Sequence, residues 1–220
     1  MELYRKRLGF SNVREDMISH TAFLVNEDFE HSPHYKTVWI DNQETDAHVK
    51  NTRYSHIKMF TLRPSTKVTK GMYIQLNDDI YISTNPTDNE IYPKIEAKLC
   101  NNYIRWQKED GNVAEYPCSI EGDSIEIRDR IRTNQRYLMG SEARVTVTVQ
   151  YNEDTIEIQP KQRFIFNGHS YEVQKIDANT DAYKGVGNIT LVVEAVSKSH
   201  TDNSEDGIAD NSGESGWSGW

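Results

Sequence analysis

Two cysteines are the most reactive side chains of the sequence, and their spacing decides what chemistry they could share. Cys100 and Cys118 lie on either side of Asp110-Gly111, a dipeptide typical of tight β-hairpin turns. With a two-residue turn, Cys118 faces Tyr103, and Cys100 lies three positions out of register. A longer loop or a bulge would still bring the thiols together as a disulfide or as half of a metal site. We favour two reduced structural thiols, because two cysteines in 220 residues do not make a disulfide framework.

The other reactive side chains form no recognisable catalytic or metal-binding pattern. Zinc would need two more ligands at close spacing, and the sequence has no Cys-x-x-Cys. His31 and His34 are the only close histidine pair, and Pro33 between them breaks any helix that would place both on one face. Lys184-Gly185-Val186-Gly187-Asn188 precedes a strand, so it predicts a hairpin turn and not a phosphate-binding loop. We therefore predict no catalytic residues, no metal, no cofactor and no enzyme activity.

The charge balance argues against sequence-specific DNA binding. The chain has 34 acidic and 25 basic residues and a formal net charge of −9, which would repel phosphate backbones over most of its surface. A ring through which DNA merely passes is a different case, because low affinity for phosphate helps sliding. The basic run 128–136 has two interpretations. It either contacts a partner, with an acidic protein surface favoured over nucleic acid, or is a solvated linker between modules.

Targeting and membrane segments are not evident in the sequence. The start, Met1-Glu2-Leu3-Tyr4-Arg5-Lys6-Arg7, is charged and leads into no apolar core of a signal peptide. No run approaches the roughly 18 apolar residues that a membrane span requires. We expect a protein that folds in a cytoplasm and does not contact a membrane.

The elements that must position these side chains are mostly strands. One helix is expected over residues 12–30, with Ser11 as its cap and Ser32-Pro33 as its end. Short apolar or alternating runs bounded by turn residues then predict antiparallel strands. These runs are 36–40, 72–76, 80–83, 95–99, 103–107, 113–116, 124–127, 145–149, 156–158, 163–166, 170–176 and 189–193. The fold class is therefore mainly β, with small antiparallel barrel or sandwich modules, one N-terminal helix and a disordered C-terminal tail.

A repeat links two of the predicted hairpins at a spacing of 90 residues. Tyr73-Ile74-Gln75-Leu76-Asn77 is followed by Tyr81, and Arg163-Phe164-Ile165-Phe166-Asn167 is followed by Tyr171. In both, an apolar strand ends at Asn, which tolerates left-handed backbone angles, and a Tyr re-enters the core. Either two β modules lie in tandem, or two ordinary hairpins have converged.

The expected organisation has four parts. Residues 1–34 form a helical arm, 35–127 a first β module, 128–196 a second β module, and 197–220 a flexible tail rich in Ser, Gly, Asp and Asn. The tail ends with Trp217 and Trp220. These tryptophans either belong to a docking peptide or are chance aromatics of an unstructured end.

A family resemblance rests on the residues around the two cysteines. Cys100-Asn101-Asn102-Tyr103-Ile104-Arg105-Trp106, the turn Asp110-Gly111 and Tyr116-Pro117-Cys118 combine Cys-Asn, an aromatic strand with Trp, a Gly turn and Pro-Cys. This pattern resembles a group of tailed-phage and prophage structural proteins of the head–tail region. Other pieces agree with it, from the basic Leu-Tyr start through His31-Ser32-Pro33-His34-Tyr35 and Gly71-x-Tyr73 to Gly207-Ile208-Ala209-Asp210.

The resemblance implies a head completion protein, similar to the stopper that lies beneath the portal and adaptor and retains packaged DNA. Such stoppers are small β-barrels that form a closed ring. It further implies contacts with the portal or adaptor protein and with tail proteins, non-specific proximity to packaged DNA, and a place in the virion neck after assembly in the host cytoplasm. The loops expected at 41–54 and 133–141 are the candidates to face the ring or its lumen.

Two alternative functions remain. A tail or baseplate component would occupy a different position in the same kind of particle. A carbohydrate-binding module would use exposed aromatic side chains such as Trp217 and Trp220.

Overall fold

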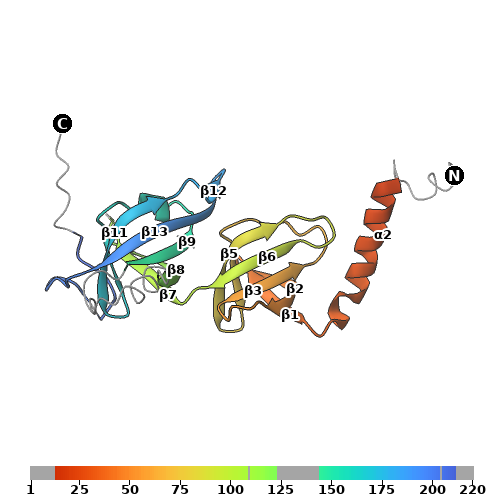
Figure 1. The fold of residues 1–220 in the computed structure, drawn as a ribbon, viewed down its shortest axis with the longest axis horizontal. Helices are drawn as coiled ribbons and strands as arrows, with labels where there is room; N and C mark the ends of the chain where they lie inside the picture. The colour runs from red at the N-terminus through yellow and green to blue at the C-terminus, as the bar shows by residue number, and fades with distance from the viewer. Residues whose placement is uncertain (1–12, 109, 123–143, 204, 212–220) are drawn as a thin grey trace, which may run out of the picture. The chain divides into compact units, whose positions relative to one another are not determined.

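The computed structural model describes residues 13–108, 110–122, 144–203 and 205–211, which form two compact units (Figure 1). The chain divides between Leu99 and Cys100 into unit 1 and unit 2. The sequence analysis instead expects the module boundary at 127/128. The difference arises because the strands at 43–51 and 57–62 carry little hydrophobic alternation and were not predicted. Without them, the predicted first module needed the strands between 100 and 127. The strands at 102–107 and 113–122 belong to unit 2, where the second of them pairs with the strand at 144–150.

In the part of the chain that the structure describes, one helix precedes the strands, at the predicted position. Helix α2 (Val13–Asp28) continues into a short 3-10 helix, η1 (Phe29–His31). Ser32 has φ −72° and ψ 135°, the extended backbone that a following proline imposes on the preceding residue. Pro33 therefore ends the helix as expected.

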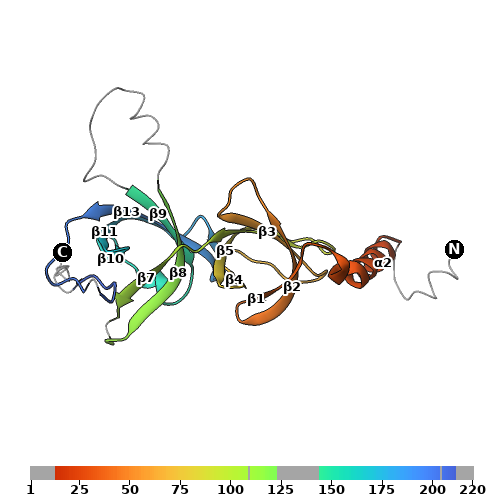
Figure 2. The same cartoon turned by 90° about the horizontal axis from the view of Figure 1, so that it is seen from below.

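Unit 1 is a closed six-stranded barrel. Its strands are β1 (Tyr35–Ile40), β2 (Gln43–Asn51), β3 (Ile57–Leu62), β4 (Tyr73–Leu76), β5 (Asp79–Thr87) and β6 (Lys94–Leu99). The order around the barrel is β1-β2-β3-β6-β5-β4, and β1 closes it by pairing with β4 (Figure 2). Inward-facing apolar side chains fill the barrel, among them Phe60, Leu62, Ile74 and Ile95. A closed barrel leaves no long sheet edge open.

The loop expected from Asp41 to Tyr54 is mostly strand, so this expectation was wrong. Asp41 and Asn42 have φ of 45° and 67° and form a two-residue turn, after which Gln43 pairs with Ile40. Strand β2 then runs to Asn51 between β1 and β3. It was missed because Ala47 is its only buried residue, and one small side chain gives no visible alternation.

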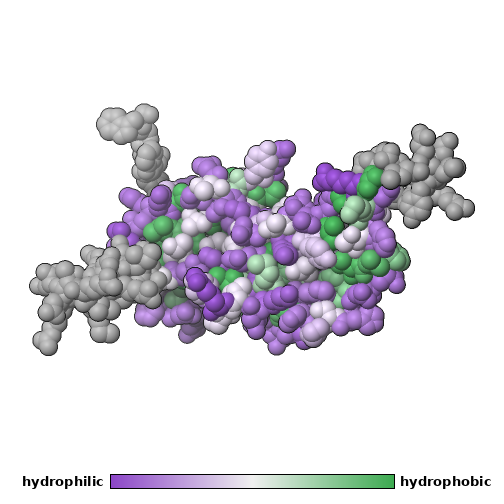
Figure 3. Space-filling view, turned by 45° about the vertical axis from the view of Figure 1, so that its right-hand side comes forward, coloured by the Kyte–Doolittle hydropathy of each residue, from purple (hydrophilic) through white to green (hydrophobic). Residues whose placement is uncertain are grey.

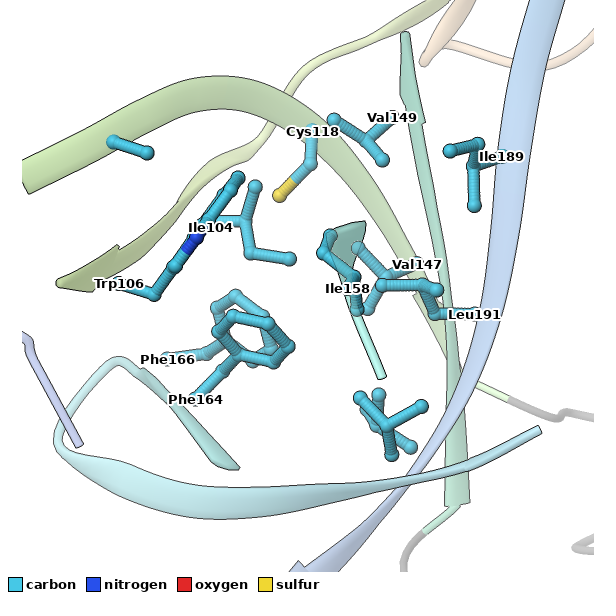
Figure 4. Packing of buried hydrophobic residues seen from close by; sticks show 13 residues of the cluster. Ile104, Trp106, Cys118, Val147, Val149, Ile158, Phe164, Phe166, Ile189 and Leu191 are labelled. Atoms are coloured by element: carbon cyan, nitrogen blue, oxygen red, sulfur yellow. The ribbon is translucent and has the colours of Figure 1, made fainter. Parts of the chain in front are cut away.

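Unit 2 is a barrel-like sheet with an additional hairpin. Its strands are β7 (Asn102–Gln107), β8 (Val113–Gly122), β9 (Arg144–Gln150), β10 (Arg163–Phe166), β11 (His169–Asp177), β12 (Ala182–Tyr183) and β13 (Val186–Val196). The order is β10-β11-β13-β9-β8-β7, and β12 pairs only with β13. Figure 4 shows the interior, where Trp106 and Phe164 meet edge to face at 6.1 Å between ring centroids. This contact joins β7 and β10, the two ends of the sheet.

The strand expected at 156–158 is a single 3-10 turn, η2 (Thr155–Glu157). The side chain of Asn152 accepts hydrogen bonds from the amides of Asp154 and Thr155 at 3.1 and 2.8 Å. These bonds close a local turn that competes with strand pairing. Ile156 is consequently exposed, and only Ile158 reaches the core.

Both units have the same strand topology. The order β1-β2-β3-β6-β5-β4 in unit 1 corresponds, element for element, to β7-β8-β9-β13-β11-β10 in unit 2. The mainly β class with two barrel-like sheets is therefore confirmed. The correspondence over six strands favours tandem modules over two hairpins that happen to look alike.

The repeat at a spacing of 90 residues extends to hydrogen bonds and irregularities. Tyr81 pairs with Ile74, and Tyr171 pairs with Phe164. Each second strand has a bulge at the same place, between 83 and 85 in β5 and between 173 and 175 in β11. The turn residues Asn77 and Asn167 have φ of 55° and 51°, as their residue type predicted.

Candidate assembly surfaces

Neither cysteine is placed to do chemistry. Both thiols are free, and Cys118 is completely buried on β8. Burial raises the pKa of the Cys100 thiol to about 12 and also raises that of Cys118. Cys118 pairs with Asn102, not with Tyr103 as the two-residue turn predicted, because Lys108 donates its amide to Asn112 in a longer loop. The loop adds one residue to the turn and shifts the register accordingly.

The described ranges, with their gaps at 109, 123–143 and 204, hold no cluster of three metal-ligating side chains. His31 and His34 are both exposed, as surface residues would be. In the same part of the chain no helix is long and apolar enough to cross a membrane. The arrangements that stand out are instead those that hold extended segments onto the barrels.

The first such arrangement fixes the C-terminal end of α2 to unit 1. Phe29 is buried and stacks on the imidazole of His48, with ring centroids 4.0 Å apart. Nε2 of His48 lies 2.7 Å from the carbonyl oxygen of Phe29, so this nitrogen is the protonated donor. The predicted loop at 41–54 therefore supplies a strand side chain that anchors the helix.

Arg63 completes this contact with four interactions. Its guanidinium donates to Asp46 and Glu30 at 2.7 and 2.8 Å, and to the carbonyl of Asn26 at 3.3 Å. The same group lies 4.8 Å from the centroid of the Phe29 ring. We call Phe29, Glu30, Asp46, His48 and Arg63 the latch. Sequence reasoning missed it, because its members come from three separate segments.

Beyond the latch, α2 exposes apolar side chains. None of its sixteen residues is buried, and Met17 and Phe23 are 66% and 60% exposed. Val13, Met17 and Leu24 recur at spacings of four and seven residues and therefore share one face of the helix. Figure 3 shows hydrophobic residues gathered on the side of unit 1 that carries α2.

A second exposed feature is the hairpin formed by β12 and the start of β13. Lys184 and Gly185 have φ of 52° and 81° and form the two-residue turn between Tyr183 and Val186, which confirms the predicted hairpin. Tyr183 is 75% exposed and Val186 48%. Unit 1 has no counterpart of this hairpin. Its strands β5 and β6 are joined by residues 88–93, whereas residues 178–189 lie between the paired ends of the equivalent strands, β11 and β13, in unit 2.

A third arrangement ties residues 197–203 and 205–211, the described part of the expected tail, to unit 2. We call this segment the strap. The carboxylate of Asp202 has no exposed surface and receives hydrogen bonds from both Nη atoms of Arg163, at 3.1 and 2.8 Å. It also accepts from the hydroxyl of Ser170 and from the amides of Ser199 and Asp210. The side chain of Asn211 accepts from the amide of Arg163 at 2.7 Å and donates to its carbonyl, as a neighbouring strand would.

The strap also contacts β7. Arg105 donates to the carbonyl of Asp206 at 3.4 Å, and a Cβ on Gly207 would lie 3.6 Å from the same guanidinium. Strands β7 and β10 approach each other (Figure 2), but no ladder joins them within the described chain. In unit 1 the equivalent strands, β1 and β4, pair with each other and close the barrel. In unit 2 the strap contacts both β7 and β10 at the corresponding place.

Several predicted features lie outside the described residues. These are the helix cap Ser11, the strand expected at 124–127, the basic run 128–136, the candidate loop 133–141 and the tryptophans at 217 and 220. The residues of the family resemblance, apart from its basic Leu-Tyr start, lie in the described part of the chain. The Cys-Asn to Pro-Cys pattern forms the β7–β8 hairpin, and Gly207 to Asp210 lies in the strap that contacts it.

Comparison with known proteins finds a family model that is similar to most of unit 2. Residues 102–194 match the YomX C-terminal domain. This family is phage-derived, so the match is consistent with a phage protein and a phage-associated location. The matched residues run from the start of β7 to two residues before the end of β13 and include the hairpin at 182–186.

The remaining comparisons add no family. No curated protein matches the chain. A solved structure titled "MrkH, A novel c-di-GMP dependence transcription regulatory factor" aligns with 83% of this chain and 85% of its own. The identity is 6% and the TM-score 0.23, so it carries no argument about fold or function.

Proposed function

We propose that the chain is a virion structural protein of the head–tail connector, a stopper-like head completion protein. Several copies form a ring below the portal or adaptor protein and retain packaged DNA. The observation that carries this proposal is the β7–β8 hairpin, because the residues that resemble head–tail proteins fold into it inside the region matched by a phage-derived domain.

The two barrels support an assembling role over a catalytic one. Each unit is a small, closed or nearly closed β module, and its extended segments are held by specific polar contacts. The chain carries a formal charge of −9, which suits a lumen through which DNA slides without binding. We propose no catalytic role, no cofactor and no membrane contact.

The experiment is deletion of the coding sequence from the phage or prophage that carries it, followed by complementation. A stopper-like protein predicts heads that package DNA and then lose it, so that nuclease sensitivity of the DNA rises and falls again on complementation. Filled heads that keep their DNA but lack tails would contradict the stopper role and favour a tail component. Normal virions without this chain would contradict any virion role.

A further inference from the structure

Helix α2 leaves several apolar side chains exposed. An isolated helix of 16 residues is only marginally stable in water, and most helical stability in proteins comes from packing of an apolar face. Here the latch holds one end, yet Val13, Met17 and Leu24 remain at least half exposed. These side chains lie on one face of the helix, with the exposed His20 between Met17 and Leu24, and we call Val13, Met17 and Leu24 the α2 stripe.

The hairpin at 182–186 presents a second exposed apolar surface, which carries a positive charge. It is an addition to a scaffold that unit 1 builds without it, so the barrel fold does not require it. Its tip exposes Tyr183 and Val186, and its only charge is Lys184, whose Nζ lies 5.2 Å from the Tyr183 ring centroid. The tip is thus apolar and cationic.

The charges of α2 complement that tip. Glu27 and Asp28 flank the α2 stripe on its two sides when the helix is projected down its axis, and both are exposed. The one Lys or Arg side chain of the described helix is Arg14, three residues before Met17 and at the other end of the stripe from Glu27 and Asp28. An apolar row bordered by carboxylates fits an apolar tip that carries a lysine.

We propose that the α2 stripe of one copy of this chain binds the Tyr183–Val186 hairpin of a second copy. Because the two surfaces are different, the contact is head to tail, and repetition of such a contact builds a closed ring or a filament. Tyr183 covers Met17 and Leu24, while Lys184 pairs with Glu27 or Asp28. The inference rests on the proposed ring for its biological role and names the contact between neighbouring copies.

The test mixes two variants of the full-length chain, each with one added cysteine. Met17→Cys and Val186→Cys are combined with a short thiol-specific cross-linker, so that a mixed dimer must join two copies. Cys100 and Cys118 give little background, because burial raises the pKa of both thiols. The matched control is Ser19→Cys, an exposed position on the opposite side of α2.

The expected result is cross-linked dimer from Met17→Cys with Val186→Cys, and much less from Ser19→Cys with Val186→Cys. Lys184→Glu should weaken self-association by about fivefold, and Glu27→Lys in the partner copy should recover most of that loss. Equal yields with Met17→Cys and Ser19→Cys would overturn the inference. Cross-linking only within single chains that carry both Met17→Cys and Val186→Cys would also overturn it. The same holds for cross-linked dimers that form from Met17→Cys alone.

The outcome separates the contact from the proposed function. Specific cross-linking in solution together with absence of the chain from purified virions would support the contact and contradict the connector role. Absence of specific cross-linking at the highest soluble concentration, with the chain present in virions, would contradict the contact and leave the connector role standing.

Discussion

Arg163 and Asp202 form a buried ion pair that fastens the strap to the edge of unit 2. Nη2 of Arg163 lies 2.8 Å from Oδ2 of Asp202, whose side chain has no exposed surface. Breaking such a pair by removing one partner costs about 3–5 kcal/mol, because the other charge stays buried and unpaired. The strap is therefore expected to be part of the folded unit, even though its composition suggested a tail.

Asp202→Ala should lower the free energy of unfolding by about 3 kcal/mol or more, and urea denaturation of the full chain measures this. Arg144→Ala is the matched control. Its guanidinium lies 3.7 Å from Glu194 and is half exposed, so its loss should cost less than about 1 kcal/mol. Equal effects of the two variants would show that the strap contributes little.

Acid should destabilise the protein through Asp202. Burial alone would raise the pKa of this carboxyl, but hydrogen bonds from Asp210, Ser199 and Ser170 and the charge of Arg163 hold the pKa below its usual range. A lowered folded-state pKa gives stability that is present above the unfolded value, about 3.9, and is lost as the pH falls through the folded value. Unfolding free energies between pH 7 and pH 2 should therefore fall more steeply for the native chain than for Asp202→Asn.

High pH should destabilise the folded protein through Tyr116. Burial and the hydrogen bond from its hydroxyl to Asp154, at 2.6 Å, raise the pKa of Tyr116 to about 12. The neutral phenol is thus favoured in the folded state, and stability is lost as the pH rises from the unfolded value of about 10 toward 12. Tyr116→Phe should reduce this loss. An unchanged alkaline slope would contradict the assigned hydrogen bond.

Gly187 is required by the hairpin that we place at the contact between copies. Its φ is 146°, and an added Cβ would lie 2.1 Å from the carbonyl oxygen of Asp181. Gly187→Ala should force the backbone apart and lower thermal stability markedly. Gly185→Ala is the control, because it has left-handed backbone but open space, with an expected cost of about 1–2 kcal/mol.

The latch predicts that the helix can be released without unfolding unit 2. Phe29→Ala removes the buried ring between His48 and Arg63, a change that typically costs about 3–5 kcal/mol. Amide hydrogen exchange of residues 13–28 should become faster, while exchange in β13 stays unchanged. Protection of α2 that does not respond to this substitution would mean that the latch does not hold the helix.

Sequence patterns predicted the elements whose hydrophobic periodicity was strong. Strands such as β4, β9 and β10 had clear apolar spacing, and Asn77 and Asn167 marked the turns after β4 and β10 by residue type. The helix at 13–28 was predicted mainly from a stretch without Gly or Pro, because its apolar side chains lie on several faces. Strand β2, with one buried alanine, had no such signal. The module boundary was misplaced because β2 and β3 were both missed, which left the first module two strands short.

Long-range polar pairs could not be predicted from local patterns. Arg63 lies 33 residues from Glu30, and Arg163 lies 39 residues from Asp202, so neither spacing suggests contact. The composition of 197–211 favoured a tail, since the energy that holds the strap comes from a few buried hydrogen bonds and not from an apolar face. Only the folded barrels bring these partners together.

The measurement that tests the central claim most directly is cryo-electron microscopy of the neck of the intact particle. The connector proposal predicts a ring of density between portal and tail into which both β units of each copy fit. Density for this chain only at the tail tip, or nowhere in the particle, would contradict it.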